Sequence, residues 1–262
     1  HKEYRRQRQM CIRDWNMAAA EFGTLGEPLE ETQRRVRMAA RALPRHGLGH
    51  AYGHISARLD DKMFLVCAPK PMGLIAPGEV GDLVPIEGAL PEGVLGEVRG
   101  HQQIYRRRAD VNGICRTFLR DVMTLSTMRL TPRALHGFAS YFAPCPPLWD
   151  DAALLRSDEA AGRLAEALGD ARAIVMRGNG AIMTGASVEE SIVMAFYLEE
   201  AAKTELAVLA AGNRMTPVEM TEAEAEARAV SSGRIFERMW DYLTFGDPEG
   251  CPPDPIRSLI HI

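Results

Sequence analysis

The sequence lacks the features that mark three classes of protein. It contains five cysteines among 262 residues, an odd number, and no two of them form a Cys-x-x-Cys pair. Such usage is typical of reduced thiols in a reducing compartment, not of a disulfide framework or a structural zinc site. No run of about 18 apolar residues is present, so no membrane-spanning helix is predicted. The N-terminus has no apolar secretory signal either, and we expect a cytoplasmic protein.

An excess of basic residues is also missing. The chain has 31 Lys and Arg residues against 35 Asp and Glu residues, a formal net charge of -4. Proteins that depend on nucleic acid usually carry a basic surface, so nucleic acid is not a predicted partner. Arg34, Arg35 and Arg37 lie close together, but acidic residues are near them in the sequence. We therefore predict that this group forms a solvated helix face.

What is present is the pattern of a folded α/β protein. Predicted strands span residues 63–67, 83–86, 113–117, 173–176 and 181–184, and predicted helices span residues 30–43, 97–108, 119–128, 156–168, 187–211 and 222–243. Mixed strands and helices in one unbroken run predict a three-layer α/β/α sandwich around a central mixed sheet. We expect an N-terminal helical arm and linker (1–28), one α/β domain (29–247) and a C-terminal tail (248–262).

Residues 47–58 combine glycines with side chains that bind anions. Glycine lets a backbone pass close to a ligand, and hydroxyl groups and backbone N–H groups bind negative charge. This predicts contacts with a substrate from Gly53, His50, Ser56 and Arg58, and a catalytic role for His54. A plain turn with a structural histidine is the alternative.

Glu97 begins a predicted helix that also carries His101 and Tyr105 on one face, four residues apart. A carboxylate in this position is a candidate general acid or base, but it also stabilises a helix N-terminus without any chemistry. For His101 we expect a neutral, hydrogen-bonded position in the interior.

Four short motifs together resemble those of a known family. They are Gly-His-Ile-Ser-Ala-Arg (53–58), Glu-x-x-x-His-x-x-x-Tyr (97–105), Asp-Val-Asn-Gly (110–113) and Arg-Gly-Asn-Gly (177–180). Over roughly residues 30–212 the chain resembles the class II aldolase/adducin family. It is more similar to the branch that decarboxylates carboxymuconic semialdehydes and pyridine dicarboxylates than to the sugar-phosphate aldolases. The resemblance implies a class II aldolase/adducin-like fold and a homo-tetramer with sites between subunits.

The family is built around a divalent metal ion held by three histidines, and this chain departs from that pattern. Where the family has His-x-His, the chain has Arg116-Thr117-Phe118, and Asn179 stands at the third position. An arginine stays charged and repels a metal cation, but its guanidinium binds a carboxylate or enolate oxygen. We therefore predict no metal, with catalytic roles for Arg116 and Asn179. Three alternatives stay open: Arg116 points to a surface acid, Asn179 serves only the turn, or zinc or manganese is held by relocated ligands (His50, His54, His136 and Glu97).

The resemblance and these replacements predict a lyase that decarboxylates a β-keto or vinylogous β-keto acid from an aromatic or natural-product pathway. Arg116 and Asn179 would stabilise the enolate, and Glu97 or His54 would return the proton as a general acid. His136 and Arg120 are further candidate substrate ligands, and the partner is a small-molecule carboxylic acid. The alternatives are another lyase, isomerase or aldolase reaction through the same enolate, or a catalytically inactive adducin-like binding protein.

Overall fold

The structure is a computed structural model that describes residues 28–212 and 216–250. The predicted N-terminal arm up to residue 27 and the tail beyond Gly250 lie outside the described residues, as do Cys11 and Cys251. Of the remaining cysteines, Cys67 and Cys115 are buried free thiols and Cys145 is an exposed one. Within the described ranges, no helix is both long and apolar enough to span a membrane.

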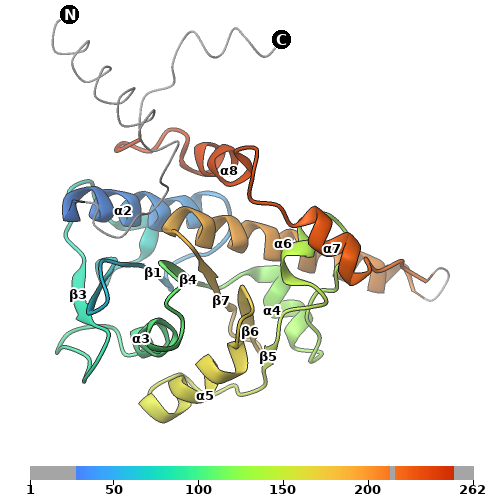
Figure 1. Ribbon diagram of the computed structural model, residues 1–262, viewed down its shortest axis with the longest axis horizontal. Coiled ribbons are helices and arrows are strands. Elements are labelled where there is room, and N and C mark those ends of the chain that lie inside the picture. Colours follow the sequence, from blue (N-terminus) through green and yellow to red (C-terminus); the bar gives the residue numbers. More distant parts are fainter. Residues whose placement is uncertain (1–27, 213–215, 251–262) are drawn as a thin grey trace, which may run out of the picture.

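A seven-stranded mixed sheet forms the centre of the fold, in the order β3-β2-β1-β4-β7-β6-β5 (Figure 1). The strands are β1 (His54–Arg58), β2 (Met63–Val66), β3 (Asp82–Pro85), β4 (Gly113–Thr117), β5 (Leu148–Trp149), β6 (Ala173–Met176) and β7 (Ala181–Gly185). Neighbouring strands are antiparallel except β5 and β6, which are parallel. β1 and β4 lie side by side at the middle of the sheet, although β1 begins at residue 54 and β4 at residue 113.

Helices cover both faces of this sheet. The first layer holds α2 (Leu29–Arg45), α6 (Val188–Ala211) and α8 (Ile235–Thr244), and the second holds α3 (Val98–Arg107) and α5 (Asp158–Leu168) (Figure 1). The shorter elements are η1 (Met72–Leu74), α4 (Arg120–Ser126), which packs on α6, η2 (Ala139–Phe142) and α7 (Glu222–Arg228), which packs on η2. The predicted three-layer α/β/α sandwich around a mixed sheet is thus confirmed.

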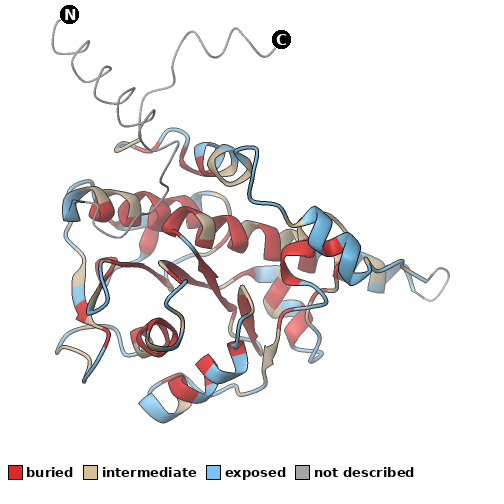
Figure 2. Cartoon of the chain, in the orientation of Figure 1, coloured by how far each residue is buried: buried red, intermediate tan, exposed pale blue. Residues whose placement is uncertain are grey.

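The sheet separates two hydrophobic cores, and the central strands are buried on both faces (Figure 2). One core lies between the sheet and α2, α6 and α8, and contains Ile55 and Cys115. The other lies between the sheet and α3 and α5, and contains Ile114 and Ile182. Side chains alternate between faces along a strand, so His54, Ser56 and Arg58 of β1 face α3. Polar groups are therefore placed inside the second core.

The predicted elements differ from the structure in two places. The predicted helix over residues 222–243 is wrong: α7 ends at Arg228 and α8 begins at Ile235. Gly233 (φ 76°) and Arg234 (φ 57°) lie between them in the left-handed region, which a continuous right-handed helix does not contain. The strands β1 and β5 were not among the predicted strands, and β1 was missed because its polar side chains resemble those of a loop.

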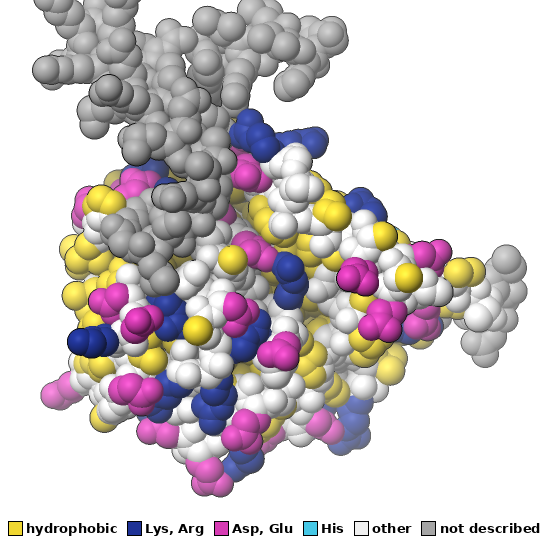
Figure 3. Space-filling view, in the orientation of Figure 1, with side chains coloured by type: hydrophobic (Ala, Val, Ile, Leu, Met, Phe, Trp, Pro, Cys, Tyr) yellow, Lys and Arg dark blue, Asp and Glu magenta, His cyan; other side chains and the backbone are white. Residues whose placement is uncertain are grey.

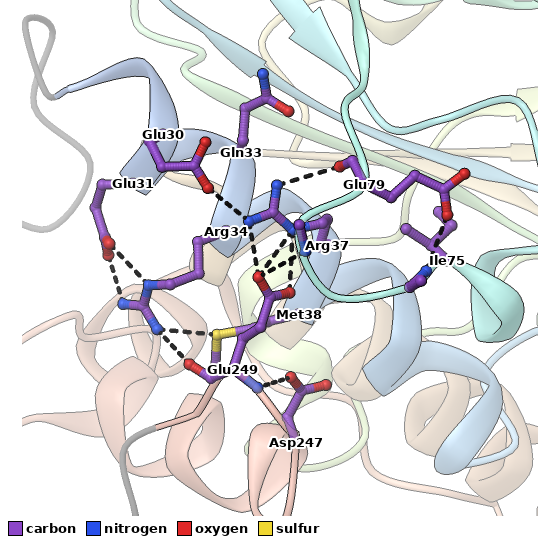
Figure 4. Close-up of polar contacts among 12 residues, drawn as sticks. Glu30, Glu31, Gln33, Arg34, Arg37, Met38, Ile75, Glu79, Asp247 and Glu249 are labelled. Atoms are coloured by element: carbon purple, nitrogen blue, oxygen red, sulfur yellow. Dashed lines mark hydrogen bonds and ion pairs between the residues drawn. The ribbon is translucent and has the colours of Figure 1, made fainter.

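The prediction that Arg37 lies on a solvated face of α2 is wrong, because its side chain is 3% exposed. Arg37 donates to Glu249 at 2.7 to 3.0 Å (Figure 4). Arg41 donates to both Asp247 and Glu249 at 2.6 to 2.9 Å. Arg45 adds a bond to Asp247 at 2.8 Å. We call these five residues the arginine clasp, because they attach the segment after α8 to α2.

Charges of both signs are mixed on the face of the molecule shown in Figure 3, with apolar side chains between them. No broad field of one sign dominates this face, as the near-balanced composition suggests.

Candidate active site

The candidate active site is centred on Arg116 in the middle of β4. In the sheet register Arg116 lies opposite His54 of β1 and opposite Ile182 of β7. Its side chain is 1% exposed and faces the α3 layer, between the sheet and the start of α3. The alternative that Arg116 points outward to a surface acid is therefore wrong.

The Arg116 guanidinium is incompletely paired. Nη1 donates to the carbonyl oxygen of Thr117 at 3.1 Å, and Nη2 has no hydrogen bond although it is buried. The nearest carboxylate oxygen, Oε2 of Glu97, is 3.5 Å from Nη2. The Phe118 ring covers the guanidinium, with its centroid 4.3 Å from Cζ. Burial lowers the pKa of Arg116, and only the charge of Glu97 and the neighbouring Cys115 oppose this shift.

Glu97 occupies the N-cap position of α3, but its side chain makes no capping hydrogen bond. The carboxylate instead faces Arg116 and is 24% exposed. A purely helix-capping role for Glu97 is therefore wrong. Glu97 gives the site its contact with solvent, next to a cation that is otherwise enclosed.

His54 begins a chain of buried hydrogen bonds that runs from the sheet into α3. Its Nδ1 lies 2.9 Å from Nε2 of His101, and Nδ1 of His101 lies 2.6 Å from Oγ of Ser56. Oγ of Ser56 in turn lies 2.8 Å from the hydroxyl oxygen of Tyr105. The neutral, hydrogen-bonded interior position predicted for His101 agrees with this geometry.

Both imidazoles are held in the neutral form. Burial and the nearby Arg116 guanidinium lower the pKa of His54 to about 3. Burial, His54 and Arg116 lower the pKa of His101 well below its ordinary value. The Nε2 atom of His54 is buried and has no hydrogen-bond partner. His54, which lies opposite Arg116 in the sheet register, therefore keeps one neutral nitrogen without a partner.

Asn179 lies in the turn between β6 and β7. Its backbone N–H donates to Met176, as the predicted turn role requires, yet its Nδ2 is buried without a partner. The next residue, Gly180, has φ 76°, and a Cβ there would lie 3.0 Å from Nη1 of Arg116. The turn thus brings Gly180, the residue after Asn179, against the guanidinium, and a side chain at 180 would disturb it.

Aromatic rings form the outer rim of this site. Phe118 is half-buried, and the exposed rings of His50 and Tyr52 lie with centroids 5.8 and 6.1 Å from it. Gly53 allows this segment to approach β4, since its φ is 120° and a Cβ would lie 2.6 Å from the Arg116 carbonyl oxygen. Of the predicted substrate ligands, His50 and Gly53 are therefore beside the site.

The structure does not bring four other predicted substrate ligands to the Arg116 guanidinium. Ser56 is fully buried behind His54, and its hydroxyl is engaged by His101 and Tyr105. Arg58 donates its guanidinium N–H groups to three backbone carbonyls, those of residues 105, 108 and 111. Both are corrected to structural positions, because the Ser56 hydroxyl and the Nε and Nη2 groups of Arg58 are already hydrogen-bonded within the protein.

His136 and Arg120 are the other two predicted substrate ligands that lie away from the Arg116 guanidinium. The His136 ring contacts Phe138, which stacks on Tyr197 of α6, so His136 lies on the α6 side of the sheet and not on the α3 side. Arg120 is exposed at the first residue of α4. The prediction of His136 as a ligand at this site is wrong, because the sheet separates it from Arg116.

Three residues contribute to the site in ways that sequence reasoning missed. Tyr105 ends the hydrogen-bond chain, Phe118 covers the guanidinium, and Gly180 makes room for it. The spacing of His101 and Tyr105 on one helix face was the available signal for the first. For Phe118 and Gly180 the local sequence holds no such signal, because each acts through a contact with another strand.

The site does not fit the divalent metal ion that the family resemblance implies. The ligand positions hold a cation (Arg116), a phenyl ring (Phe118) and an amide (Asn179). His54 has a guanidinium beside it, whose charge opposes a second cation. Across residues 28–212 and 216–250, no three His, Cys, Asp or Glu side chains are grouped so that they could hold a metal ion. The relocated ligand set is not assembled either, since His136 lies across the sheet.

Comparison with known proteins places this geometry in a family. The chain is similar to 3,4-dihydroxyphthalate decarboxylase from Arthrobacter keyseri, with 28% identity over 74% of this chain and 86% of the relative. It is also similar to decarboxylase tropJ from Talaromyces stipitatus, with 26% identity over 62% of this chain and 70% of the relative. Its fold matches an aldolase II superfamily protein from Pseudomonas syringae, with a TM-score of 0.69, 24% identity and coverage of 82% and 90% of the two chains. The model of the Class II Aldolase and Adducin N-terminal domain matches residues 34–206, and the chain belongs to this family.

Proposed function

We propose that this chain is a carbon–carbon lyase that decarboxylates a β-keto or vinylogous β-keto acid, using Arg116 and Asn179 in place of a metal ion. The observation that carries the proposal is the set of buried, unpaired nitrogen atoms: Nη2 of Arg116, Nδ2 of Asn179 and Nε2 of His54. A buried polar group without a partner costs about 1–3 kcal/mol, so an anionic ligand that pairs with all three is favoured. The names of the decarboxylases from Arthrobacter keyseri and Talaromyces stipitatus support the reaction class.

Substrate binding begins with an exchange of carboxylates. The distance of 3.5 Å between Nη2 of Arg116 and Oε2 of Glu97 is too long for a good hydrogen bond, so this pair is weak. A substrate carboxylate or carbonyl oxygen that approaches from the exposed Glu97 side gains two N–H donors at once. Glu97 then moves aside and stays near the bound substrate.

Cleavage moves charge toward the paired donors. The bond between the substrate's α-carbon and its carboxylate carbon breaks, carbon dioxide leaves, and the electron pair forms an enolate whose negative charge lies on the keto oxygen. Arg116 and Asn179 donate to this oxygen. One preorganised donor of this kind contributes about 3 kcal/mol to the stability of the transition state, or roughly 10²-fold in rate. Two donors thus supply a large part of the stabilisation that a metal ion gives.

Proton return completes the reaction. A protonated Glu97 transfers its proton to the α-carbon, so that a C–H bond forms from the enolate electron pair. Glu97 suits this step because its carboxyl group is the part of the site that is open to solvent and can be protonated again. His54 is the less suitable acid, since its neutral imidazole would be left as an imidazolate.

The unpaired donors also argue against an inactive adducin-like binding protein. A buried site without a function would be more stable with apolar side chains than with an unpaired guanidinium and amide. Arg116 and Asn179 therefore fit a site that binds an anion.

The test is a screen of carbon dioxide release from β-keto acids and hydroxylated aromatic dicarboxylic acids, with wild type and Glu97→Gln. We expect turnover of at least one such acid by wild type. Glu97→Gln should bind it with similar affinity, measured by calorimetry, and lose most of the turnover, because an amide cannot supply the proton. Equal loss of binding and turnover would mean that Glu97 only shapes the site, and no turnover of any acid would refute the lyase assignment.

A further inference from the structure

The hydrogen-bond chain behind His54 has one unused end, and its direction can be worked out. Its four side chains, His54, His101, Ser56 and Tyr105, are between 0% and 3% exposed. The chain is enclosed by protein, so we expect each hydrogen to be donated within it. In the described part of the protein, the Tyr105 hydroxyl has Ser56 Oγ as its one hydrogen-bond partner.

That single contact fixes the direction at the Tyr105 end. If Tyr105 accepted from Ser56, its own hydroxyl hydrogen would be buried without an acceptor. Tyr105 therefore donates to Ser56. Among the described residues, the other hydrogen-bond partner of Ser56 Oγ is Nδ1 of His101, so Ser56 donates to that nitrogen. Nδ1 of His101 is then without a hydrogen, and a neutral imidazole carries its hydrogen on the other nitrogen.

The same reasoning applies to His54. Nε2–H of His101 donates to Nδ1 of His54 across 2.9 Å. Nδ1 of His54 is thus an acceptor, and the hydrogen of this neutral ring is on Nε2. Nε2 is the buried atom that has no partner.

We propose that His101, Ser56 and Tyr105 are positioning residues that hold His54 in its Nε2–H tautomer, so that His54 adds a hydrogen-bond donor to those of Arg116 and Asn179, opposite the Glu97 carboxylate. Nε2–H of His54, Nη2 of Arg116 and Nδ2 of Asn179 are then three unpaired donors without an acceptor among them. The ligand that fits is one that offers only acceptors, such as a carboxylate or an enolate. This inference rests on the proposed function for the identity of the anion, but the tautomer is a property of the free protein.

The direct measurement is nitrogen NMR of the full chain with ¹⁵N-labelled histidine, without substrate. Imidazole nitrogen shifts separate a nitrogen that carries hydrogen from one that does not, and the variants His54→Gln and His101→Gln assign the signals. We expect both residues to be neutral Nε2–H tautomers at pH 7. A hydrogen on Nδ1 of either ring, or a charged imidazolium, would overturn the proposal.

A matched pair of serine variants tests the positioning role. Ser56→Ala removes the donor to His101, so His54 should lose its single tautomer and its Nε2 signal should move toward the position of a nitrogen without hydrogen. Ser191→Ala is the control, because Ser191 is equally buried but its hydroxyl donates to the carbonyl of Val188 in α6. Unchanged His54 signals in a folded Ser56→Ala variant would show that the chain does not set the tautomer.

The proposed function and this inference can fail separately. If wild type shows both Nε2–H tautomers but no acid is decarboxylated, the lyase assignment fails and the tautomer assignment stands. If an acid is decarboxylated, Ser56→Ala should raise KM for it, because His54 binds the anion. The ratio of the rates in water and in deuterium oxide should stay unchanged, because His54 does not supply the proton. A Ser56→Ala variant with wild-type KM would contradict the donor role of His54.

Discussion

Two buried arginines of this protein differ in how completely they are paired. Arg41 of the arginine clasp donates to Asp247, Glu249 and the Ile75 carbonyl oxygen, at 2.6 to 3.1 Å. Arg116 has one backbone hydrogen bond and a carboxylate at 3.5 Å. The pKa values move in opposite directions: burial is outweighed by two carboxylates at Arg41, which raise its pKa, whereas burial dominates at Arg116 and lowers it. The fully paired arginine ties two segments of the fold together, whereas the incompletely paired one is the residue to which the proposed function assigns a ligand.

Removing the paired arginine should have the largest effect on stability. Arg41→Met leaves Asp247, whose side chain is fully buried, without its main partner, and we expect a loss of about 3–5 kcal/mol in the free energy of unfolding. Urea denaturation measures it. Arg163→Ala is the control, because the Arg163–Glu159 pair is exposed and should contribute under about 0.5 kcal/mol. Equal losses in the two variants would mean that the clasp is only a surface contact.

Removing the incompletely paired arginine should have the opposite profile. Arg116→Met keeps most of the side-chain volume and removes a buried charge without strong partners, so we expect the free energy of unfolding to stay equal or rise. Decarboxylation should fall by roughly 10²–10³-fold, since a donor to the enolate is lost. Denaturation and turnover of the same preparation measure both. A destabilisation as large as that of Arg41→Met would remove the distinction between the two arginines.

Asn179→Ala should reduce turnover less than Arg116→Met, by about 10²-fold, because a neutral amide stabilises charge less than a guanidinium does. Asn179 is not in the left-handed region, so alanine fits the turn without backbone strain. Steady-state kinetics should show the loss mainly in kcat. Wild-type kcat would mean that Asn179 serves only the turn.

Acid should weaken the arginine clasp. Burial raises the pKa values of Asp247 and Glu249, but hydrogen bonds from arginines outweigh it. Arg41 and Arg45 hold the pKa of Asp247 below its ordinary value, and Arg37 and Arg41 do the same for Glu249. The folded protein thus binds fewer protons than the unfolded chain. This stabilisation is complete above the unfolded-chain values of about 4 and is lost as the pH falls through the folded-state pKa values.

We therefore expect the free energy of unfolding to fall below about pH 4 in wild type, with a flatter dependence in Arg41→Met. The loss is smaller than that caused by removing Arg41, because protonated carboxyl groups still accept hydrogen bonds. Urea denaturation between pH 3 and pH 7, taken as roughly the range in which carboxyl groups titrate, measures the slopes. Parallel slopes for the two proteins would contradict the assigned partners.

The sequence predicted the layers of the fold well because most elements follow apolar periodicity. β4 was predicted with its observed bounds, and Ser157 caps α5 as expected, accepting a hydrogen bond from Ala160. β1 escaped prediction for the opposite reason: His54, Ser56 and Arg58 are polar, yet they are buried against α3. Their partners are a histidine, a tyrosine and backbone carbonyls distant in sequence, which local patterning does not contain.

The candidate site was predicted in outline, but the positions of several of its residues were predicted wrongly. Arg116, Glu97 and Asn179 were identified from a family pattern, and the structure brings them together. Arg58 was chosen as part of the anion-binding segment and His136 for the region of the fold in which it lies, and tertiary contacts place both elsewhere. Arg37 was expected in solvent because the acids near it in sequence are common on helix surfaces, whereas its main partner, Glu249, lies 212 positions away.

The most direct test of the central claim is decarboxylation by chelator-treated wild type beside Arg116→Met, with an acid from the screen and with zinc or manganese added back. The account predicts that treated wild type keeps its turnover, that added metal does not raise it, and that Arg116→Met loses roughly 10²–10³-fold. Turnover that disappears with the chelator and returns with metal, or that survives in Arg116→Met, would contradict the assignment of the metal's task to Arg116.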